Sequence, residues 1–142
     1  MKSVRAGITY FALVFVAGFA LGLVRVPILV PHIGERAAEL VEAPFMLAAI
    51  VVSSRWIALR FLSGASGFAH FAAGGLALAL MLTVELAVVM RLRGLTMREY
   101  VDGRDPVAGT VYVALLILFA IFPLVQGLAA KRRSSARRST IS

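Results

Sequence analysis

The chain contains no cysteine, and this absence removes several kinds of site at once. Disulfides, thiolate metal sites, covalently attached haem and cysteine nucleophiles are all excluded. Only two histidines are present, His32 and His70, and His70 lies 15 residues, or ~22 Å of helix, from Glu85. The Glu-x-x-His pairs of di-iron bundles, the serine nucleophile elbow, the P-loop and the dinucleotide fingerprint are also missing. We therefore expect no metal and no cofactor.

Charged residues are scarce as well, at 15% of 142 residues, while 61% of the chain is hydrophobic. A soluble domain of this size could not bury so much apolar surface. Four apolar runs are each close to the ~20 residues that a helix needs to cross a ~30 Å hydrocarbon core. They are Ala6–Val24, Ala37–Ile57, Phe68–Met90 and Val107–Ala130. The sequence thus predicts an all-α protein, a four-helix transmembrane bundle in one domain of residues 1–130, with spans at about 6–25, 35–60, 67–91 and 106–129.

The first run has an alternative interpretation as a secretory signal. Lys2 and Arg5 precede it, and small residues near its end offer a cleavage site. This run is 19 residues long and exceeds the ~7–15 residues that are usual in the apolar region of a signal peptide. We therefore expect it to be retained as a span.

The lysines and arginines are divided unequally between the two sets of helix ends. Nine lie on one side (Lys2, Arg5, Arg55, Arg60, Lys131, Arg132, Arg133, Arg137 and Arg138) and six on the other (Arg25, Arg36, Arg91, Arg93, Arg98 and Arg104). The positive-inside rule places the richer side, and with it both termini, in the cytoplasm. All seven carboxylates fall on the outer side: Glu35, Glu39, Glu42, Glu85, Glu99, Asp102 and Asp105. A polar site is therefore expected at the outer face.

The first two connections contain helix-breaking residues. Pro27 and Pro31 predict that residues 25–34 form a rigid outer loop, because proline lacks an N–H and its ring obstructs a helix. Residues 63–67, Ser-Gly-Ala-Ser-Gly, are typical of a short cytoplasmic turn.

The third connection carries two capping patterns. Thr96 and Glu99 have the spacing of a capping box, which predicts one or two turns of interfacial helix before Gly103. Asp105 followed by Pro106 predicts the N-cap and first residue of the fourth span.

Three carboxylates share one face of the second span. Glu35, Glu39 and Glu42 are spaced i, i+4 and i+7, so Glu42 lies ~10 Å inward from Glu35. The outer two can equally be solvated residues at a helix N-terminus. Pro44 leaves the carbonyl of Leu40 without a helical donor, which can form part of an intramembrane polar site or simply reflect how common proline is in membrane helices.

Glu85 in the third span stands six residues, or ~9 Å, inward from Arg91, a depth similar to that of Glu42. An ionisable group at this depth is expensive and points to function. Three interpretations stay open: a structural Glu–Arg pair, proton or cation handling, and acid/base catalysis. The candidate polar-site residues are Glu39, Glu42, Glu85, Arg25, Arg36 and Arg91, with Arg93 as a further available cation; catalytic residues are not assigned.

Small and aromatic residues offer packing signals. Gly18 and Gly22 form a Gly-x-x-x-Gly step, and Gly74-Gly75 interrupts the third span, so helices can approach closely there, within the bundle or in a homo-oligomer. Tyr10, Trp56, Tyr100 and Tyr112 stand near the predicted interfaces and are expected to form an aromatic belt.

Residues 131–142 are basic and polar, and their composition predicts a disordered cytoplasmic tail. Its five cations are each attracted to anionic lipid by about 1 kcal/mol at most. A net charge of +8 would also suit nucleic acid, but no interleaved aromatics accompany these charges, so we expect no nucleic-acid partner.

Residues 34–44 (GERAAELVEAP), 98–100 (REY) and 104–110 (RDPVAGT) resemble a group of uncharacterised small four-span bacterial integral membrane proteins. The resemblance covers nearly the whole chain and implies a multi-pass location in the bacterial inner (plasma) membrane, but no activity.

Three classes of function remain open at this point. The first is a membrane protein with an outer Glu/Arg cluster that binds a polar ligand or handles protons or ions. The second is a non-catalytic subunit or scaffold whose charge cluster is structural, within a homo-oligomer or larger membrane complex. The third is a membrane enzyme that uses Glu42 and Glu85 as acid and base on a lipid-like substrate.

Overall fold

The computed structural model describes residues 2–92, 94, 96–103 and 105–141, so Arg93 and Arg104 lie outside the described residues. Every regular element in this part of the chain is helical. In chain order the elements are α1 (Lys2–Val24), the π-helix η1 (Arg25–Leu29), α2 (Val30–Ile33), α3 (Glu35–Arg60), α4 (Gly67–Leu92), α5 (Met97–Asp102) and α6 (Pro106–Ile141). Four helical segments are long and apolar enough to cross a membrane, which confirms the all-α prediction: 2–33, 35–60, 67–92 and 106–141.

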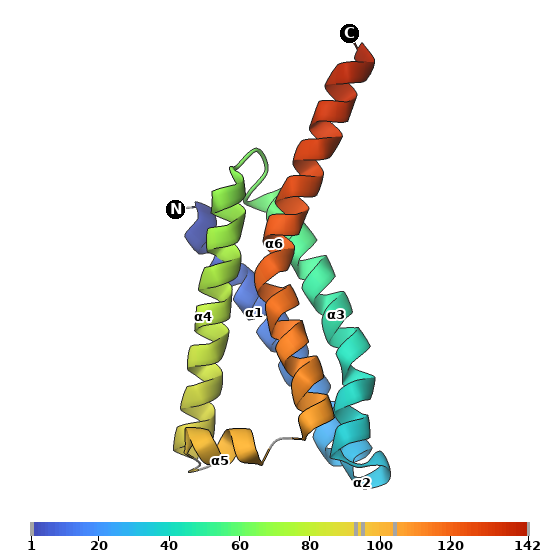
Figure 1. Ribbon diagram of the computed structural model, residues 1–142, viewed down its shortest axis with the longest axis vertical. Coiled ribbons are helices and arrows are strands. Elements are labelled where there is room, and N and C mark those ends of the chain that lie inside the picture. The colour runs from blue at the N-terminus through green and yellow to red at the C-terminus, as the bar shows by residue number, and fades with distance from the viewer. Residues whose placement is uncertain (1, 93, 95, 104, 142) are drawn as a thin grey trace.

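The four long helices run along the longest axis of the molecule (Figure 1). Helices α1 and α6 each pack against both α3 and α4, so the four helices form a closed bundle in the order α1, α3, α6, α4. The N-terminus, the connection between α3 and α4, and the C-terminal part of α6 lie at one end, which we name the tail end. Helices α2 and α5 lie at the other, which we name the α2/α5 end (Figure 1).

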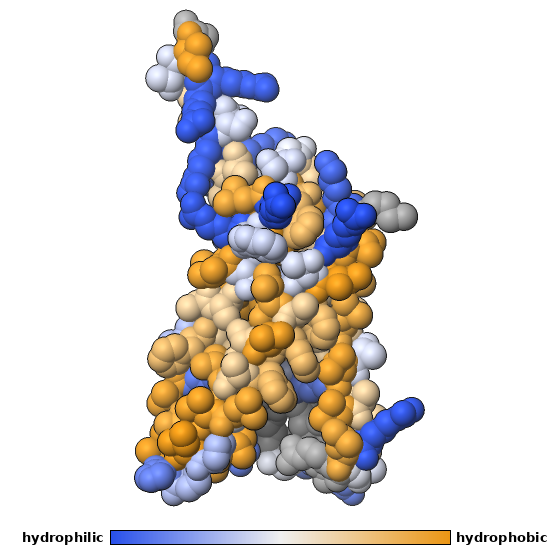
Figure 2. All heavy atoms as spheres, turned by 180° about the vertical axis from the view of Figure 1, so that it is seen from behind, coloured by the Kyte–Doolittle hydropathy of each residue, from blue (hydrophilic) through white to orange (hydrophobic). Residues whose placement is uncertain are grey.

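The outer surface of the bundle is apolar over most of its length. Large apolar side chains face outward on several helices, as Val16 (64% exposed) and Val52 (67% exposed) illustrate. Figure 2 shows this apolar surface between hydrophilic residues that gather at the two ends. A continuous apolar band of this kind suits lipid rather than water as the surrounding solvent.

The core is narrow and rich in small residues. Ala6 and Gly7 of α1 meet Ala73 of α4 so closely that a Cβ on Gly7 would lie 2.9 Å from the Ala73 carbonyl oxygen. Larger side chains fill the centre, where Tyr10 and Phe119 are both buried and stack with ring centroids 4.5 Å apart. Small residues let the backbones approach, and the two rings fill the space that remains.

The prediction of an outer loop at residues 25–34 is wrong, because the helix continues through both prolines. The turn after α1 widens into η1, in which the N–H of Val30 donates to the carbonyl of Arg25. A π-helical turn of this kind absorbs the missing N–H and the ring of Pro27. The helix ends instead at Gly34, whose φ of +86° suits glycine, and α3 begins at the next residue.

The predicted caps of the third connection are confirmed. The N–H of Thr96 donates to the Glu99 carboxylate and the N–H of Glu99 donates to the Thr96 hydroxyl, both at 3.2 Å. Helix α5 therefore begins with a reciprocal capping box. Asp105 accepts a hydrogen bond of 2.9 Å from the N–H of Ala108, as expected for the N-cap of α6.

The basic tail differs from the disordered segment that its composition suggests. Helix α6 continues to Ile141, and residues 131–141 are exposed. Lysine, arginine and alanine favour helix, and a segment that extends an existing helix needs no new nucleation. The tail therefore projects from the bundle as a continuation of α6 (Figure 1).

Candidate functional site

A cavity of about 850 Å³ lies between the four long helices. Its lining includes carboxylates from three of them: Glu39 and Glu42 of α3, Glu85 of α4, and Asp105 directly before α6. The fourth segment contributes Arg25, from the turn of η1 that follows α1. The cavity thus brings together charged groups that are up to 80 residues apart in the sequence.

Arg25 bridges two of these carboxylates. Its Nε atom lies 2.6 Å from Oε2 of Glu42, and its Nη1 atom donates to Oε1 of Glu39 at 3.2 Å. The Nε and Oε2 atoms of the shorter pair are both shielded from solvent. The two glutamates are three residues apart and so share one face of α3, which allows one guanidinium to reach both. One positive charge thus serves two negative ones.

Glu85 has a different partner across the cavity. The hydroxyl of Tyr112 in α6 donates a hydrogen bond to Oε2 of Glu85 in α4. This contact ties two helices whose ends at the α2/α5 end are connected through α5. A phenol neutralises no charge, so this interaction orients the carboxylate without cancelling its charge.

A third polar contact joins α3 to the start of α6. Both Nε and Nη2 of Arg36 donate to Oδ1 of Asp105, at 2.8 and 2.6 Å. These bonds, together with the N–H of Ala108, hold the pKa of Asp105 below its usual value. Arg36 itself is largely exposed, so the pair lies at the rim of the cavity.

The six candidate residues therefore separate into distinct environments. Glu39, Glu42, Glu85 and Arg25 all line the cavity, whereas Arg36 reaches only the rim through Asp105. Arg91 is exposed and has no ion-pair partner among the residues that the structure describes. The arginine that pairs with Glu42 is thus Arg25.

Pro44 stands beside these groups in α3, and Leu40, whose carbonyl it leaves without a helical donor, also lines the cavity. Within the described residues, no group of three or more His, Asp or Glu side chains could hold a metal ion. Among the residues that the structure describes, the cavity lining thus contains six carboxylates, the guanidinium of Arg25 and the phenol of Tyr112.

Two polar residues of this region were not predicted as site residues. Tyr112 was expected in an aromatic belt and Asp105 only as a cap, yet Tyr112 binds Glu85 and Asp105 binds Arg36. Tyr112 stands seven residues, or ~10 Å, after Asp105 and therefore near the depth of Glu85, a spacing that could have indicated it. The side chain of Tyr100 lies outside the described residues.

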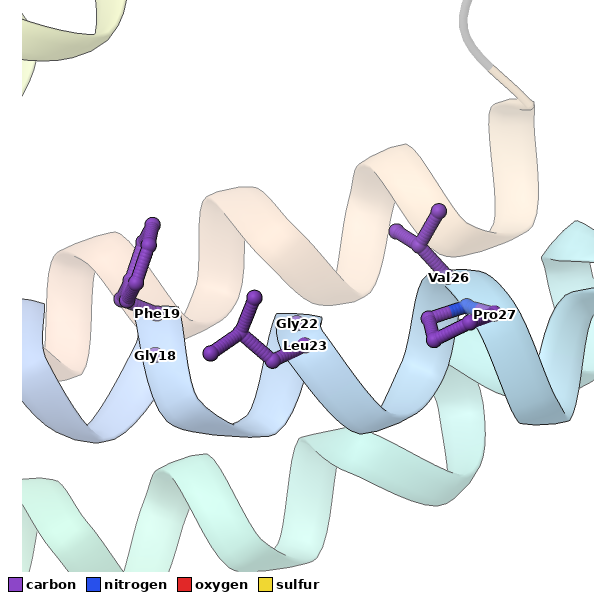
Figure 3. Close-up of a pocket in the computed structure, with 6 residues that line it drawn as sticks. All are labelled: Gly18, Phe19, Gly22, Leu23, Val26 and Pro27. Atoms are coloured by element: carbon purple, nitrogen blue, oxygen red, sulfur yellow. The ribbon is translucent and has the colours of Figure 1, made fainter.

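A second, apolar concavity of about 480 Å³ lies on the outside of α1 and η1. Figure 3 shows its lining side chains, Phe19, Leu23, Val26 and Pro27, beside Gly18 and Gly22. A Cβ on Gly22 would meet no atom within 4 Å, so this glycine is not required for packing inside the bundle.

In comparisons with protein-family models, curated proteins and solved structures, this chain matches none of them.

Proposed function

We propose that this chain is a multi-pass protein of the bacterial inner membrane, with both termini in the cytoplasm. The nine lysines and arginines of the richer set belong to the tail end, and the positive-inside rule assigns that end to the cytoplasm. The resemblance to small four-span bacterial membrane proteins agrees with this location. The α2/α5 end then faces outward.

The function we propose is to hold a polar ligand, a proton or an ion in the cavity at this outer end. One observation carries the proposal: Glu39, Glu42 and Glu85, from two helices, and Arg25, from a third segment, line one space of about 850 Å³. Carboxylates inside apolar helices are costly. Carboxylates that served only to pack helices together would not require a cavity of this volume around them.

The alternative is a structural scaffold, and one contact favours it. Arg25 binds Glu39 and Glu42 together, which locks η1 against α3 without any ligand. In this interpretation the cavity is filled by lipid and never by water. The two proposals therefore differ in whether water reaches the carboxylates.

The partners that we propose are membrane lipids, with anionic lipid beside the basic residues 131–138 at the cytoplasmic end. We also propose that the chain assembles with a second copy of itself or within a larger membrane complex.

Because the chain has no cysteine, single thiols can test for water directly. Ala43→Cys and Val111→Cys place a thiol in the cavity lining, whereas Val41→Cys and Val113→Cys place one two residues away on the exposed faces of the same helices. A water-soluble, membrane-impermeant maleimide reacts with the thiolate, which forms only where water is present.

Applied from outside to intact spheroplasts, the reagent should label the two cavity thiols and spare the two lipid-facing ones. Labelling of all four positions would indicate a loosened bundle, and labelling of none would favour the scaffold.

A further inference from the structure

Helices α1 and α4 pack tightly only in their halves toward the tail end. Ala6, Tyr10 and Val14 of α1 are buried there, as are Ala73 and Ala77 of α4. Among the residues whose burial the structure describes, none is buried beyond Val14 in α1 or beyond Ala77 in α4. Figure 1 shows α1 beginning near α4 at the tail end and running away from it toward the end of the bundle where α2 lies. The seam between α1 and α4 is therefore closed at the tail end and loosens toward the α2/α5 end.

The other three seams of the bundle are held together in this same half. Ala38 of α3 and Ala108 of α6 are both buried near the α2/α5 end. Each of the three seams also carries a polar contact: Arg25 with Glu42 between η1 and α3, Arg36 with Asp105 between α3 and the start of α6, and Tyr112 with Glu85 between α6 and α4. An entrance to the cavity from the side is thus expected between α1 and α4.

The side chains that line the cavity on these two helices are partly exposed. Phe15 and Phe19 of α1 are 39% and 62% exposed. Val88 and Leu92 of α4 are 43% and 80% exposed. On the opposite wall, none of the α6 side chains that line the cavity is exposed. A side chain that both lines a cavity and is exposed stands at its opening, so the cavity opens sideways between α1 and α4, toward the lipid that surrounds the bundle.

The apolar concavity on α1 and η1 continues into this opening. Gly18 and Phe19 line both the concavity and the cavity. Figure 3 shows Phe19, Leu23 and Val26 projecting from the same side of the helix. An apolar groove therefore runs along the surface of α1 and past Phe19 into the cavity.

The opening has the depth of one leaflet of a bilayer. From Met81 to Leu92, α4 rises by 11 residues or ~16 Å, and half of a ~30 Å hydrocarbon core is ~15 Å. Val14, Ile50 and Phe119, all about 2% exposed, line the inner part of the cavity. Water does not favour a space with apolar walls, and an empty space deprives its lining of dispersion contacts. Hydrocarbon from the surrounding leaflet is the occupant that suits both the walls and the opening.

We propose that an acyl chain of a bilayer lipid enters the cavity sideways between α1 and α4, from the leaflet at the α2/α5 end. Its methyl end lies against Ile50 and Phe119, and its headgroup stays near the α2/α5 end. The volume of about 850 Å³ lies within the ~300–1,000 Å³ of sites that bind small organic molecules. Met46 and Met81, two adaptable side chains, line the cavity and suit a flexible chain. The inference goes beyond the proposed function, because it assigns the apolar inner part of the cavity and its entrance rather than the carboxylates.

Photoreactive lipids test this directly. The full chain is placed in nanodiscs with phosphatidylcholine that carries a diazirine at the methyl end of one acyl chain, and adducts are mapped by mass spectrometry after irradiation. We expect adducts at Ile50 and Phe119, which lipid around the bundle cannot reach. Ile57, equally buried in α3 but outside the cavity lining, is the matched control and should stay unlabelled. Absence of adducts at both Ile50 and Phe119 would overturn the proposal, as would equal labelling of Ile57, which would indicate a loosened bundle.

A second probe tests the direction of the chain. A diazirine beside the carboxyl end of the acyl chain should label Ala43, which lines the cavity seven residues or ~10 Å outward from Ile50, and should spare Ile50. The opposite order of the two probes would contradict entry from the leaflet at the α2/α5 end.

Two pairs of variants locate the path of the chain. Leu115→Trp fills the cavity lining and should abolish the adducts at Ile50, whereas Ile117→Trp, on the exposed face of α6, should not. Val88→Trp narrows the opening without adding bulk to the buried core, so it tests the entrance even if Leu115→Trp fails to fold. It should reduce the adducts at Ile50, whereas Leu82→Trp, exposed on α4 and outside the lining, should not. Unchanged adducts in both Leu115→Trp and Val88→Trp would overturn the proposal.

The outcomes separate this inference from the proposed function. Adducts at Ile50 without maleimide labelling of the cavity thiols would support the acyl chain and reject the hydrated site. Maleimide labelling without adducts at Ile50 would leave the hydrated site and reject the acyl chain. Adducts confined to Phe19 and Val88 would mean that lipid, or a second copy of the chain, only covers the opening, and this too would overturn the proposal.

Discussion

The hydroxyl of Tyr10 in α1 donates a hydrogen bond to the main-chain carbonyl of Phe119 in α6, at 2.6 Å and out of contact with solvent. That carbonyl would normally accept the N–H of residue 123, but residue 123 is a proline inside α6. In an apolar surrounding, a carbonyl without a donor is costly. Tyr10 therefore supplies from another helix the hydrogen bond that Pro123 removes.

Tyr10→Phe should destabilise the bundle by about 1–3 kcal/mol, because it leaves a buried carbonyl without a donor while keeping the ring that stacks on Phe119. The measurement is the thermal midpoint of the detergent-extracted protein. Pro123→Ala gives the matched test, since it restores an N–H to α6. The loss caused by Tyr10→Phe should shrink in the Pro123→Ala background, and equal losses in both backgrounds would contradict the argument.

Gly74 and Gly75 are adjacent in α4 but should respond very differently to the same substitution. A Cβ on Gly74 would overlap the carbonyl oxygen of Ala120 in α6, whereas one on Gly75 would meet nothing within 4 Å. Gly74→Ala should therefore lower the thermal midpoint strongly or prevent folding. Gly75→Ala should leave it unchanged or raise it slightly, because alanine favours helix by up to about 1 kcal/mol. Similar behaviour of the two variants would mean that α4 and α6 do not cross here.

The four long helices could be predicted from the sequence because each apolar run has the length of a span, and length does not depend on tertiary contacts. The caps at Thr96 and Asp105 could be predicted for a related reason, since capping patterns involve residues only three apart. The continuation of the helix through Pro27 could not be predicted from the sequence. It depends on a widened turn, and a proline alone does not show whether a helix ends or adapts.

The candidate site could be predicted only in part. The depths of Glu42 and Glu85 follow from counting residues, and both side chains line the same cavity. Their partners, Arg25 and Tyr112, depend on how each helix is rotated about its axis. Helices that are apolar on nearly all sides give little information about that rotation. The position of Tyr10 was missed for the same reason, because its partner is 109 residues away.

The contact between Arg36 and Asp105 should make stability depend on acidity. The pKa of Asp105 is lowered in the folded state, chiefly by the hydrogen bonds from Arg36 and then by the N–H of Ala108. The unfolded chain binds a proton more readily, so this contribution is complete above the unfolded value of about 3.9 and is lost as pH falls through the lower folded value.

Asp105→Asn should thus lower the thermal midpoint at pH 6, and the difference from the parent should narrow as pH falls below about 3.9. Asp102→Asn, whose partner Arg98 lies at 3.8 Å on the surface, is the control and should change little. Asparagine caps a helix about as well as aspartate does, so a gap that does not narrow at low pH would show that the loss does not come from the negative charge of Asp105.

The proposed orientation makes a simple prediction about reporters. Fusions after Ser66 and at the C-terminus should report a cytoplasmic location, because both positions belong to the tail end with its nine cations. A fusion within residues 102–104 should report the outside. Alkaline phosphatase and green fluorescent protein give opposite signals on the two sides and check each other. An external C-terminus would reverse the bundle and put the cavity on the cytoplasmic side.

Arg25 should contribute far more to stability than Arg91, although both stand near the outer ends of predicted spans. Arg25→Gln leaves Glu39 and Glu42 facing the cavity without their shared cation. Truncating one partner of a fully buried pair costs about 3–5 kcal/mol, and the partial exposure of Arg25 reduces our expectation to about 1–3 kcal/mol. Arg91→Gln alters an exposed side chain and should change the thermal midpoint little.

Adding Glu42→Gln to Arg25→Gln removes the stranded charge, so the double variant should recover part of the loss. Without that recovery, the guanidinium would stabilise the fold through the packing of its carbon chain rather than through its charge.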